Sequence, residues 1–328
     1  MKLRRGVLIL VILLSLAACT QPAQTGTDNN NDADRAEEAR ISDGFADGQA
    51  PQDTDQSLIF LFFSDTQANP EFSDYSDIGK LLESALLPDD NAEAVIFGGD
   101  SINDGGNAAE WSAFRLAIDP FTGGLITAAV AGNHDNYALL AEQFDYPGKA
   151  PSSREEGYFY SFRTGPVFFI MLDSNTMGAA NQADIDWLRR DLQSEDSRMA
   201  CWRIAVIHHP MWPVADIPKD IQRAETMREY FLPILEEYGV RLVLCGHQHV
   251  YARTLPMSGD AASSDESGII QIMAASGDKA SYIPGEHDYI AACAPAPNYL
   301  SVFADHEQLI ITAYDGEHCI IDETVIRR

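Results

Sequence analysis

The sequence predicts an α/β fold, because strand-like and helix-like segments alternate along most of the chain. From Ser57 onward, short apolar runs are separated by stretches with helical periodicity. Apolar runs without polar alternation are typical of strands that are buried on both faces. Several of the runs are followed directly by Asp, Asn or His, which are residue types that commonly bind metals. Because ligands collect at the carboxyl ends of strands in open α/β sheets, the pattern predicts a site there.

The longest apolar runs predict the first strands, and the stretches between them predict the helices. Strands are expected at Leu58–Phe63, Ala94–Phe97, Leu125–Val130, Ile204–Ile207 and Leu242–Cys245. Helices are expected at Ile78–Leu87, Ala108–Ile118, Gln182–Leu192 and Ile221–Tyr238. Further strands that look antiparallel are expected to extend a second sheet, at Gly157–Arg163, Val167–Asp173, Gly268–Ala274, Tyr299–Ala304, Gln308–Tyr314 and Cys319–Ile326.

Composition limits the partners of the chain. Its 328 residues are 45% hydrophobic, which is enough for one large or two small domains with a sizeable core. The formal net charge of -28 argues against sequence-independent binding of nucleic acid, because an excess of Lys and Arg is needed to replace phosphate counterions. A metal site could still take an anionic substrate locally. The sequence does not indicate an oligomeric state.

The N-terminus predicts export. Three basic residues precede the apolar run from Val7 to Leu14, which is too short for a stable transmembrane span. The following Leu16-Ala17-Ala18-Cys19 resembles the cleavage box of a bacterial lipoprotein, which implies removal of residues 1–18 and lipidation of Cys19. The resemblance, with Thr20 after the cysteine, implies the outer membrane or cell envelope of a bacterium. An ordinary secretory signal is the alternative.

The segment 19–56 is polar and is expected to be a flexible, acidic linker between the lipidated cysteine and a domain over 57–328. Export permits disulfides, so the pairing of the other cysteines stays open. We expect Cys245 to be a small buried side chain and consider Cys293 with Cys319 as a candidate pair. No spacing of the Cys-x-x-Cys type occurs, so no thiolate metal site is expected for Cys201, Cys245, Cys293 and Cys319.

Five polar segments follow the apolar runs, and their order is more informative than any one of them. They are Asp65-Thr66-Gln67, Gly99-Asp100, Gly132-Asn133-His134-Asp135, His208-His209-Pro210 and Gly246-His247-Gln248-His249. Together they resemble the motifs of the calcineurin-like metallophosphoesterases. The resemblance covers roughly 58–326 and implies a four-layer αββα sandwich with two mixed β-sheets. Gln67 stands where the family usually has a histidine.

The resemblance implies a centre with two metal ions. Asp100 occupies the position of the bridging carboxylate, Asp65 and His249 would complete the first metal, and Asn133, His208 and His247 would complete the second. Carboxylate, amide and imidazole ligands together favour Mn, Fe, Zn or Co over Ca or Mg. Gln67 leaves three alternatives at the first metal, because its amide oxygen could bind weakly, Asn103 could substitute, or water could fill the place.

The same resemblance assigns His134 to catalysis rather than to a metal. It would protonate the leaving alkoxide, and Asp135 would orient its ring and favour the imidazolium. The alternative for Asp135 is an N-terminal cap of the following helix, and both roles can coexist. His209 could donate a hydrogen bond behind the metal ligands or only pack against its surroundings.

The last motif and the residues that follow it, Gly246 to Arg253, are similar to the Gly-His-x-His-x-Tyr-x-Arg segment of purple acid phosphatases. Tyr251 and Arg253 could therefore line the rim of the pocket, with sheet packing and solvent exposure as the alternatives. The purple enzymes bind ferric iron through a tyrosine three residues after the Gly-Asp aspartate. Here that residue is Asn103, so a purple ferric site is not expected.

The sequence thus predicts a lipid-anchored phosphoesterase that hydrolyses a phosphate ester through a metal-bound hydroxide, with two divalent or mixed-valence transition metal ions. Phosphomonoesters are favoured, because the nearest resemblance is to acid phosphatases. The alternatives are a phosphodiesterase acting on nucleotides or lipid headgroups and a non-catalytic metal-binding surface lipoprotein.

Overall fold

A computed structural model describes residues 57–68, 74–86, 91–144, 158–264 and 266–328. The expected signal peptide, Cys19 and the expected linker lie outside these residues. All elements below belong to the unit that begins at Ala50.

The first β-sheet has six strands and takes them from both ends of the described chain. Its order is β15-β14-β13-β1-β2-β3, where β1, β2 and β3 run parallel and the other pairs are antiparallel. β1 pairs with β2 on one side and with β13 on the other, so it lies at the centre of the sheet. The strands are β1 (Leu58–Phe63), β2 (Ala94–Phe97), β3 (Ile126–Ala129), β13 (Asn298–Ala304), β14 (Gln308–Asp315) and β15 (Ile320–Arg327).

The second β-sheet has seven strands and is also mixed. Its order is β12-β8-β11-β7-β6-β5-β4, with parallel pairing from β5 through β6 and β7 to β11. The strands are β4 (Tyr160–Thr164), β5 (Val167–Met171), β6 (Trp202–Val206), β7 (Leu242–Cys245), β8 (Val250–Thr254), β11 (Ile270–Met273) and β12 (Ile290–Pro295). A separate ribbon joins β9 (Met257–Ser258) to β10 (Ala261–Ala262).

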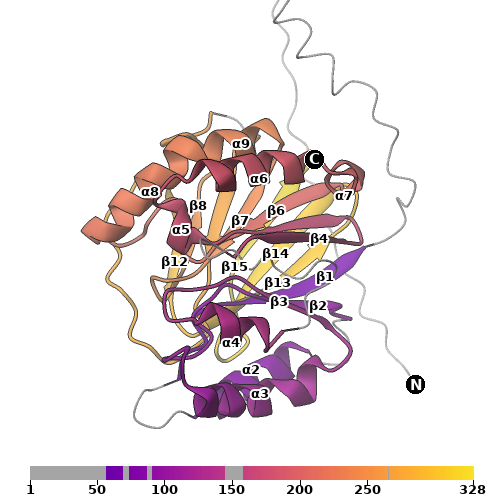
Figure 1. Cartoon of the computed structure of the whole chain (residues 1–328), viewed down its shortest axis with the longest axis vertical. Coiled ribbons are helices and arrows are strands. Elements are labelled where there is room, and N and C mark those ends of the chain that lie inside the picture. Colours follow the sequence, from indigo (N-terminus) through magenta and orange to yellow (C-terminus); the bar gives the residue numbers. More distant parts are fainter. Residues whose placement is uncertain (1–56, 69–73, 87–90, 145–157, 265) are drawn as a thin grey trace, which may run out of the picture. The chain divides into compact units, whose positions relative to one another are not determined.

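Helices cover the outer face of each sheet (Figure 1). α2 (Ser76–Ala85) and α3 (Ala108–Thr122) lie against the six-stranded sheet. α6 (Gln182–Leu192), α8 (Pro218–Tyr230) and α9 (Leu232–Glu237) lie against the seven-stranded sheet. The short helices are α4 (Tyr137–Ala141), α5 (Ser174–Met177) and α7 (Glu195–Met199). The predicted four-layer αββα sandwich is therefore confirmed.

The alternation of side chains along the buried strands explains the layers. In β5, Phe169 belongs to the core that the two sheets share, whereas Phe168 and Ile170 belong to the core under α6, α8 and α9. Neighbouring residues of a strand point to opposite faces, so a strand that is apolar throughout can fill two cores at once. Phe60 of β1 meets Phe169 edge to face, with ring centroids 4.9 Å apart, and joins the two sheets.

Three expectations about the elements were wrong. The helix expected at Ile221–Tyr238 is broken into α8 and α9, because Pro233 lacks the amide hydrogen that would continue the helix. The last three strands extend the six-stranded sheet rather than the second sheet, and β11 pairs with β7 in parallel. Strands β8 and β12 were not anticipated, because β8 directly follows the last histidine motif and β12 lacks a long apolar run.

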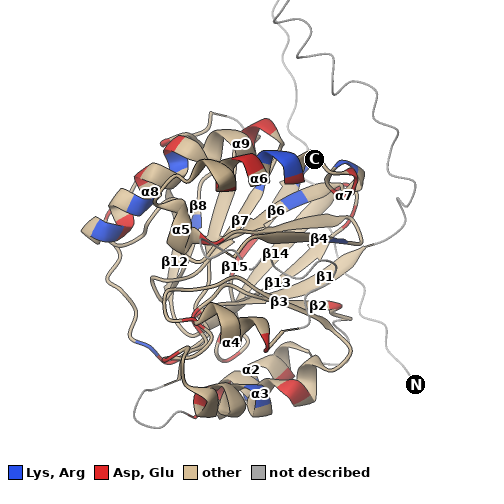
Figure 2. Cartoon of the chain, viewed as in Figure 1, with Lys and Arg blue, Asp and Glu red and all other residues tan. Residues whose placement is uncertain are grey.

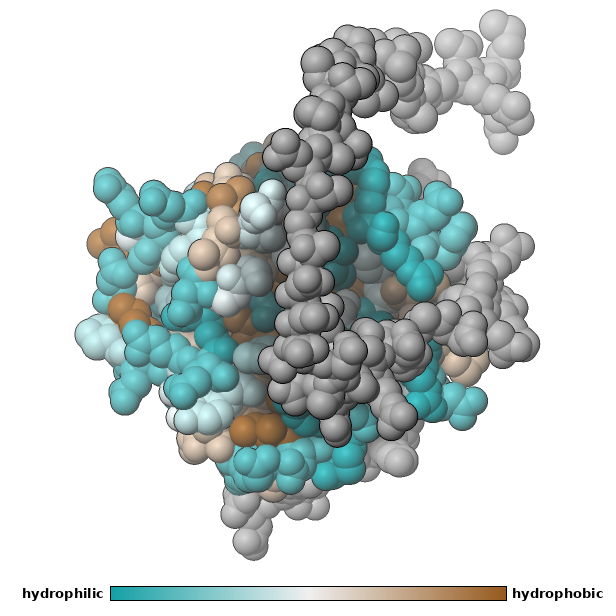
Figure 3. Space-filling view, turned by 90° about the horizontal axis from the view of Figure 1, so that it is seen from above, coloured by the Kyte–Doolittle hydropathy of each residue, from teal (hydrophilic) through white to brown (hydrophobic). Residues whose placement is uncertain are grey.

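The outer helical layer of the seven-stranded sheet is mostly hydrophilic, with scattered small hydrophobic areas (Figure 3). Within the described part of the chain, no helix combines the length and apolar character needed to cross a membrane. The four described cysteines are free. Cys245 is buried as expected. The candidate pair Cys293 and Cys319 is exposed and not bonded, since Cys293 lies on β12 of one sheet and Cys319 lies next to β15 of the other.

Candidate metal centre

The five polar segments converge where parallel strands of both sheets end. Asp65, Asp100 and Asn133 follow β1, β2 and β3 of the six-stranded sheet, and His208 and His247 follow β6 and β7 of the other sheet. The potential ligand atoms of Asp65, Asp100 and His208 all lie within 4.8 Å of one another, and so do those of His208, His209 and His247. The sequence motifs therefore form one cluster, which is built from two sheets.

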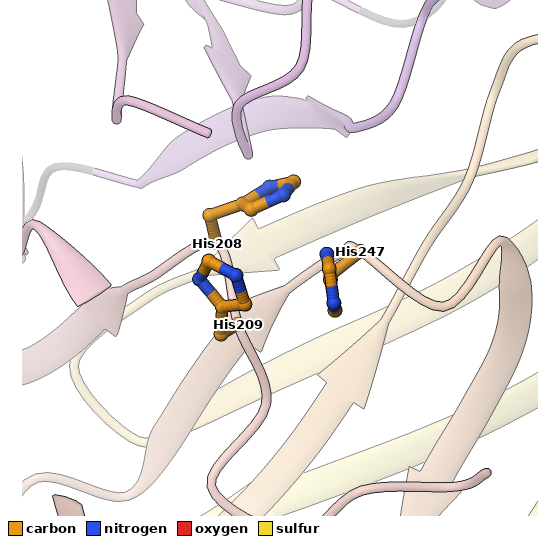
Figure 4. A group of neighbouring side chains, drawn as sticks. All are labelled: His208, His209 and His247. Carbon is orange, nitrogen blue, oxygen red and sulfur yellow. The ribbon is translucent and has the colours of Figure 1, made fainter. Parts of the chain in front are cut away.

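Figure 4 shows how the three histidines of this cluster lie. His208 and His209 are neighbours in the loop after β6, and their ring centroids are 4.9 Å apart. His247 comes from the loop after β7, with its ring 4.2 Å from that of His209 and 5.2 Å from that of His208. All three are buried. Buried imidazoles at this spacing offer several nitrogen ligands to one small volume.

Four of the expected ligands hold the backbone in the left-handed region. The φ angles are 48° for Asp65, 53° for Asp100, 75° for His247 and 49° for His249. Residues other than glycine adopt this region at a cost, and such residues concentrate at functional sites. The turns that follow the strands therefore bend sharply, which directs the side chains into the cluster.

Gly246 shows how closely the loops of the two sheets approach. A Cβ atom on Gly246 would lie 1.9 Å from Ser64 Oγ and 2.1 Å from Asp65 Oδ2. No other residue fits there without displacing the Asp65 carboxylate. The glycine of the last motif therefore allows the loop after β7 to contact the loop after β1.

Asp100 and His208 form the central pair of the cluster. His208 Nε2 lies 3.4 Å from Asp100 Oδ2 and 3.3 Å from Asn133 Oδ1, and its Nδ1 lies 2.9 Å from the carbonyl oxygen of Gly98. Burial alone would raise the pKa of Asp100, but the charge of His208 and its hydrogen bonds hold it below its usual range. Burial likewise opposes protonation of His208, but Asp100 raises the pKa of His208 to about 10.

Asp65 and His249 form a second pair. His249 Nε2 lies 3.4 Å from Asp65 Oδ1, and His249 Nδ1 lies 3.1 Å from the carbonyl oxygen of Ala280. Asp65 Oδ2 accepts hydrogen bonds from Ser64 Oγ at 2.7 Å and from the amide of His247 at 2.7 Å. The Oδ1 atom is buried and has no hydrogen bond among the described residues. The hydrogen bonds to Oδ2 thus orient the Asp65 carboxylate, and Oδ1 is available to bind a cation.

Gln67 and Asn103, the two amide side chains considered as ligands of the first metal, also have oxygens that could bind a cation. Gln67 Nε2 donates to the carbonyl of Ile102 at 3.2 Å, and Asn103 Nδ2 donates to the carbonyl of Ala68 at 2.7 Å. Their buried Oε1 and Oδ1 atoms have no hydrogen-bond partner in the described part of the chain. Buried acceptors without donors are costly unless a cation satisfies them. Together with Asp65 Oδ1, they fit a site for metal cations.

His247 is oriented by Asp220, a residue that the sequence analysis did not single out. Asp220 lies in the first turn of α8, and its Oδ2 is 3.1 Å from His247 Nε2. The same oxygen accepts a hydrogen bond from Gln248 Nε2 at 3.0 Å. A carboxylate on one ring nitrogen fixes the tautomer and leaves the other nitrogen for a metal. Asp220 belongs to no motif, so only the structure could identify it.

His209 is held away from the carboxylates of the cluster. Its Nδ1 lies 2.9 Å from Ser174 Oγ, and its own amide donates to the same hydroxyl at 2.8 Å. Burial and the neighbouring His208 and His247 lower the pKa of His209, so its ring is neutral. A neutral ring between two other imidazoles supports both of the expected roles, in hydrogen bonding and in packing.

His134 is exposed at the mouth of the cluster. Its amide donates to Asp100 Oδ1 at 2.8 Å, and its Nδ1 lies 2.7 Å from the carbonyl oxygen of Asn103. Because a carbonyl only accepts, Nδ1 carries a hydrogen and Nε2 faces outward. The ring is therefore oriented by Asn103.

The structure corrects the role expected for Asp135. Its carboxylate accepts backbone N–H groups of Asp100 at 2.8 Å, Gly132 at 2.9 Å and Ser101 at 3.3 Å. The cap of α4 is Asn136 instead. Burial and the charge of Asp100 raise the pKa of Asp135 to about 7. Asp135 thus fixes the backbone that carries the ligands, and the His134 ring makes its hydrogen bond with the carbonyl of Asn103 instead.

The contacts of Tyr251 and Arg253 favour the alternative of sheet packing over a position at the pocket rim. Tyr251 OH donates to Asp322 Oδ2 at 2.6 Å, and Arg253 contacts both oxygens of Asp322, at 2.6 and 3.2 Å. Tyr251 and Arg253 lie on β8, while Asp322 lies on β15. These side chains therefore join β8 of the seven-stranded sheet to the edge strand β15 of the six-stranded sheet, which is a structural role.

The fold and the cluster define the class of the protein. It is an αββα sandwich with candidate metal ligands in the loops that follow its strands. The family model for calcineurin-like phosphoesterases matches residues 58–251, so the chain belongs to this family. It is 28% identical over 151 residues to purple acid phosphatase 23 of Arabidopsis thaliana, covering 44% of this chain and 32% of that protein. It is also 28% identical over 186 residues to acid phosphatase type 7 of Homo sapiens, covering 50% and 41%.

A solved structure supports the same fold. Purple acid phosphatase PPD1 from yellow lupin seeds superposes with a TM-score of 0.69 at 17% identity, over 83% of this chain and 54% of that chain. The chain spans less than half of the length of each of the two curated relatives named above. Similarity to purple acid phosphatase-like members was predicted from the motifs and is confirmed.

Proposed function

We propose that the protein is a metal-dependent phosphoric ester hydrolase with two transition metal ions and a preference for phosphomonoesters. The observation that carries the proposal is the cluster of Asp65, Asp100 and His208, whose ligand atoms lie within 4.8 Å of one another beside the exposed His134. When bound, the ions would supply Lewis acidity and an activated water for attack at phosphorus.

The residues of the chain would divide the remaining work. Asp65, Asp100, Asn133, His208, His247 and His249 would hold the ions, with Gln67 or Asn103 as further oxygen ligands. Asp100 would hold both ions, and the separate contacts of its two oxygens with His208 and with the amide of His134 support this role. His134 presents Nε2 toward the opening, where a leaving oxygen could receive a proton. A mixed set of O and N ligands suits Mn, Fe, Zn or Co.

We further propose that the chain is exported and anchored to the cell envelope through Cys19. The support is the basic start, the short apolar run and the Leu16 to Cys19 box. Intact-mass analysis of the mature protein should find an acylated N-terminus at Cys19. A mature start elsewhere, without added acyl mass, would indicate plain secretion.

The catalytic proposal is tested with purified protein supplied with Mn or Co and with p-nitrophenyl phosphate or its bis-ester. We expect hydrolysis that a chelator abolishes and that the same metal restores. Asp100→Ala should lose both activity and metal, because it removes the bridging carboxylate. If no ester in a broad panel turns over with any common divalent metal, the alternative of a metal-binding surface protein is favoured.

A further inference from the structure

We propose that Lys279 binds a non-bridging phosphoryl oxygen next to His134, and that this contact makes the site prefer phosphomonoesters over phosphodiesters. The inference rests on the proposed function and specifies its substrate class. Lys279 belongs to none of the five motifs. Its Nζ lies 3.4 Å from His134 Nε2. The lysine therefore points at the same opening as the catalytic histidine.

The backbone around Lys279 is fastened to the metal-site loops. The amide of Ser276 donates to the carbonyl of Ser64 at 2.7 Å, and the amide of Gly277 donates to that of Asp65 at 3.0 Å. A Cβ atom on Gly277 would lie 2.4 Å from Gln67 O and 2.5 Å from Asp65 O, so only glycine permits this approach. The segment 276–279 is thus held directly over the first motif.

The other side of the same loop is fastened to the last motif. His249 Nδ1 lies 3.1 Å from the carbonyl oxygen of Ala280, and the amide of Tyr282 donates to the carbonyl of Gln248 at 3.2 Å. The ring centroid of Tyr282 lies 5.4 Å from that of His249. Lys279 stands between these two attachments, so its position is set by the ligand loops themselves.

The charges around Lys279 fit a role in binding an anion. The chain has 22 Lys and Arg against 50 Asp and Glu, and α6 and α8 carry five of the basic residues (Figure 2). Burial lowers the pKa of Lys279, while the charges of Asp100, Asp65 and Glu110 oppose that change and favour the ammonium form. A lysine among carboxylates adds positive charge where a phosphate must approach buried negative groups.

The charge of the ester decides how much this lysine contributes. A phosphomonoester carries almost two negative charges near neutral pH, because its second pKa is about 6, whereas a diester carries one. A diester also has a second organic group in place of one of the charged oxygens. An ammonium hydrogen bond to a charged oxygen should therefore strengthen binding of the monoester more than that of the diester.

The test compares the full-length wild-type protein with Lys279→Met, Lys279→Gln and Lys279→Arg. Lys80→Met is the matched control, because Lys80 is exposed on α2 and pairs with the exposed Asp77 at 2.6 Å. All proteins are loaded with Mn, and their metal content is measured. The readouts are kcat and KM on p-nitrophenyl phosphate and on bis(p-nitrophenyl) phosphate, and inhibition by inorganic phosphate.

We expect Lys279→Met and Lys279→Gln to lower kcat/KM on the monoester by about 10- to 100-fold, the usual scale for a hydrogen bond to a charged group. The loss should appear chiefly in KM and weaken phosphate inhibition, with a several-fold smaller effect on the diester. Lys279→Arg should retain most of the preference, and Lys80→Met should match wild type. An equal loss on both esters, or an unchanged KM for the monoester, overturns the inference.

The inference and the proposed function fail in different ways. If the wild-type protein hydrolyses no ester, the proposed function fails, and calorimetric titration of the Mn-loaded proteins with inorganic phosphate still tests Lys279. Weaker phosphate binding in Lys279→Met than in wild type and Lys80→Met supports the anion site. Equal binding in all three proteins overturns it.

Discussion

Asp220 Oδ2 lies 3.1 Å from Nε2 of His247, although the two residues come from a helix and a loop that are 27 positions apart in sequence. Both side chains are buried, and Asp220 also accepts a hydrogen bond from Gln248. The carboxylate is thereby positioned to fix the His247 ring. Nδ1 of His247 is left for a cation.

Replacing Asp220 should weaken metal binding rather than abolish the fold. Loss of a carboxylate behind a ligating histidine typically costs 10- to 100-fold in metal affinity. We expect Asp220→Ala to show this loss in a metal titration and Asp220→Asn to show a smaller one. Asp216→Ala is the control, since Asp216 is an exposed carboxylate just before α8. Equal affinity in Asp220→Ala and the control would exclude Asp220 as a positioning residue.

His134→Ala should lower kcat by roughly 10²- to 10⁴-fold, the usual scale for a general acid. Metal content should stay near that of wild type, because only the backbone amide of His134 contacts Asp100. The measurement is steady-state kinetics on esters whose leaving groups differ in pKa. Undiminished rates on esters with poor leaving groups would remove His134 from the acid role.

Gln67→His should raise the affinity for the more weakly held metal ion. Gln67 Oε1 is buried without a hydrogen bond in the described residues, and imidazole binds divalent transition metals better than a neutral amide oxygen does. Metal titrations of the two proteins, read as occupancy of the weaker site, provide the comparison. Unchanged occupancy in a folded variant would assign the first metal to Asn103 or water. Activity need not rise with affinity.

Asp322→Ala should destabilise the protein by about 1–3 kcal/mol, because it leaves the buried Tyr251 and the partly buried Arg253 without their shared acceptor. Tyr251→Phe removes one hydrogen bond and should cost about 1 kcal/mol. Urea denaturation gives both values. KM of the folded variants should equal that of wild type. An increased KM would indicate that Tyr251 and Arg253 contribute to substrate binding after all.

Removing metal should lower the stability of the native protein. A ligand that binds only the folded state at one hundred times its Kd adds about 2.7 kcal/mol. Among the described residues, Asp65 Oδ1, Gln67 Oε1 and Asn103 Oδ1 are buried without a hydrogen-bond donor, whose place a metal ion would take. We expect a lower Tm after dialysis against a chelator and recovery with Mn. An Asp100→Ala protein should not respond to Mn. A wild-type Tm that is independent of metal would argue against binding at this cluster.

The sequence predicted those parts of the fold and site whose signals are local. The first two strands begin and end where the apolar runs do, because a strand buried on both faces needs an unbroken run. The metal motifs were recognisable because each is a short segment at the end of such a strand. The bridging and ligand roles then follow from the resemblance of these motifs to the calcineurin-like metallophosphoesterases.

The remaining features depend on contacts between distant segments. Whether the strand at Asn298–Ala304 joins one sheet or the other is decided by its pairing with β1, which its own alternation does not specify. Asp220 and Lys279 are single residues with no motif around them, so only the three-dimensional structure brings them to His247 and His134. Asp322, which redirects Tyr251 and Arg253, lies 71 and 69 residues further along the chain.

The six-stranded sheet has a consequence for the order in which the protein is synthesised and becomes functional. A growing chain that has reached Tyr251 already contains all six expected ligands, yet it has only β1, β2 and β3 of that sheet. The partner of β1 on its other side, β13, begins at Asn298. The loop that carries Asp65 therefore lacks its full support until the last strands are made. We expect metal loading to follow completion of the chain. A fragment that ends at residue 251 should therefore bind metal more weakly than the full chain.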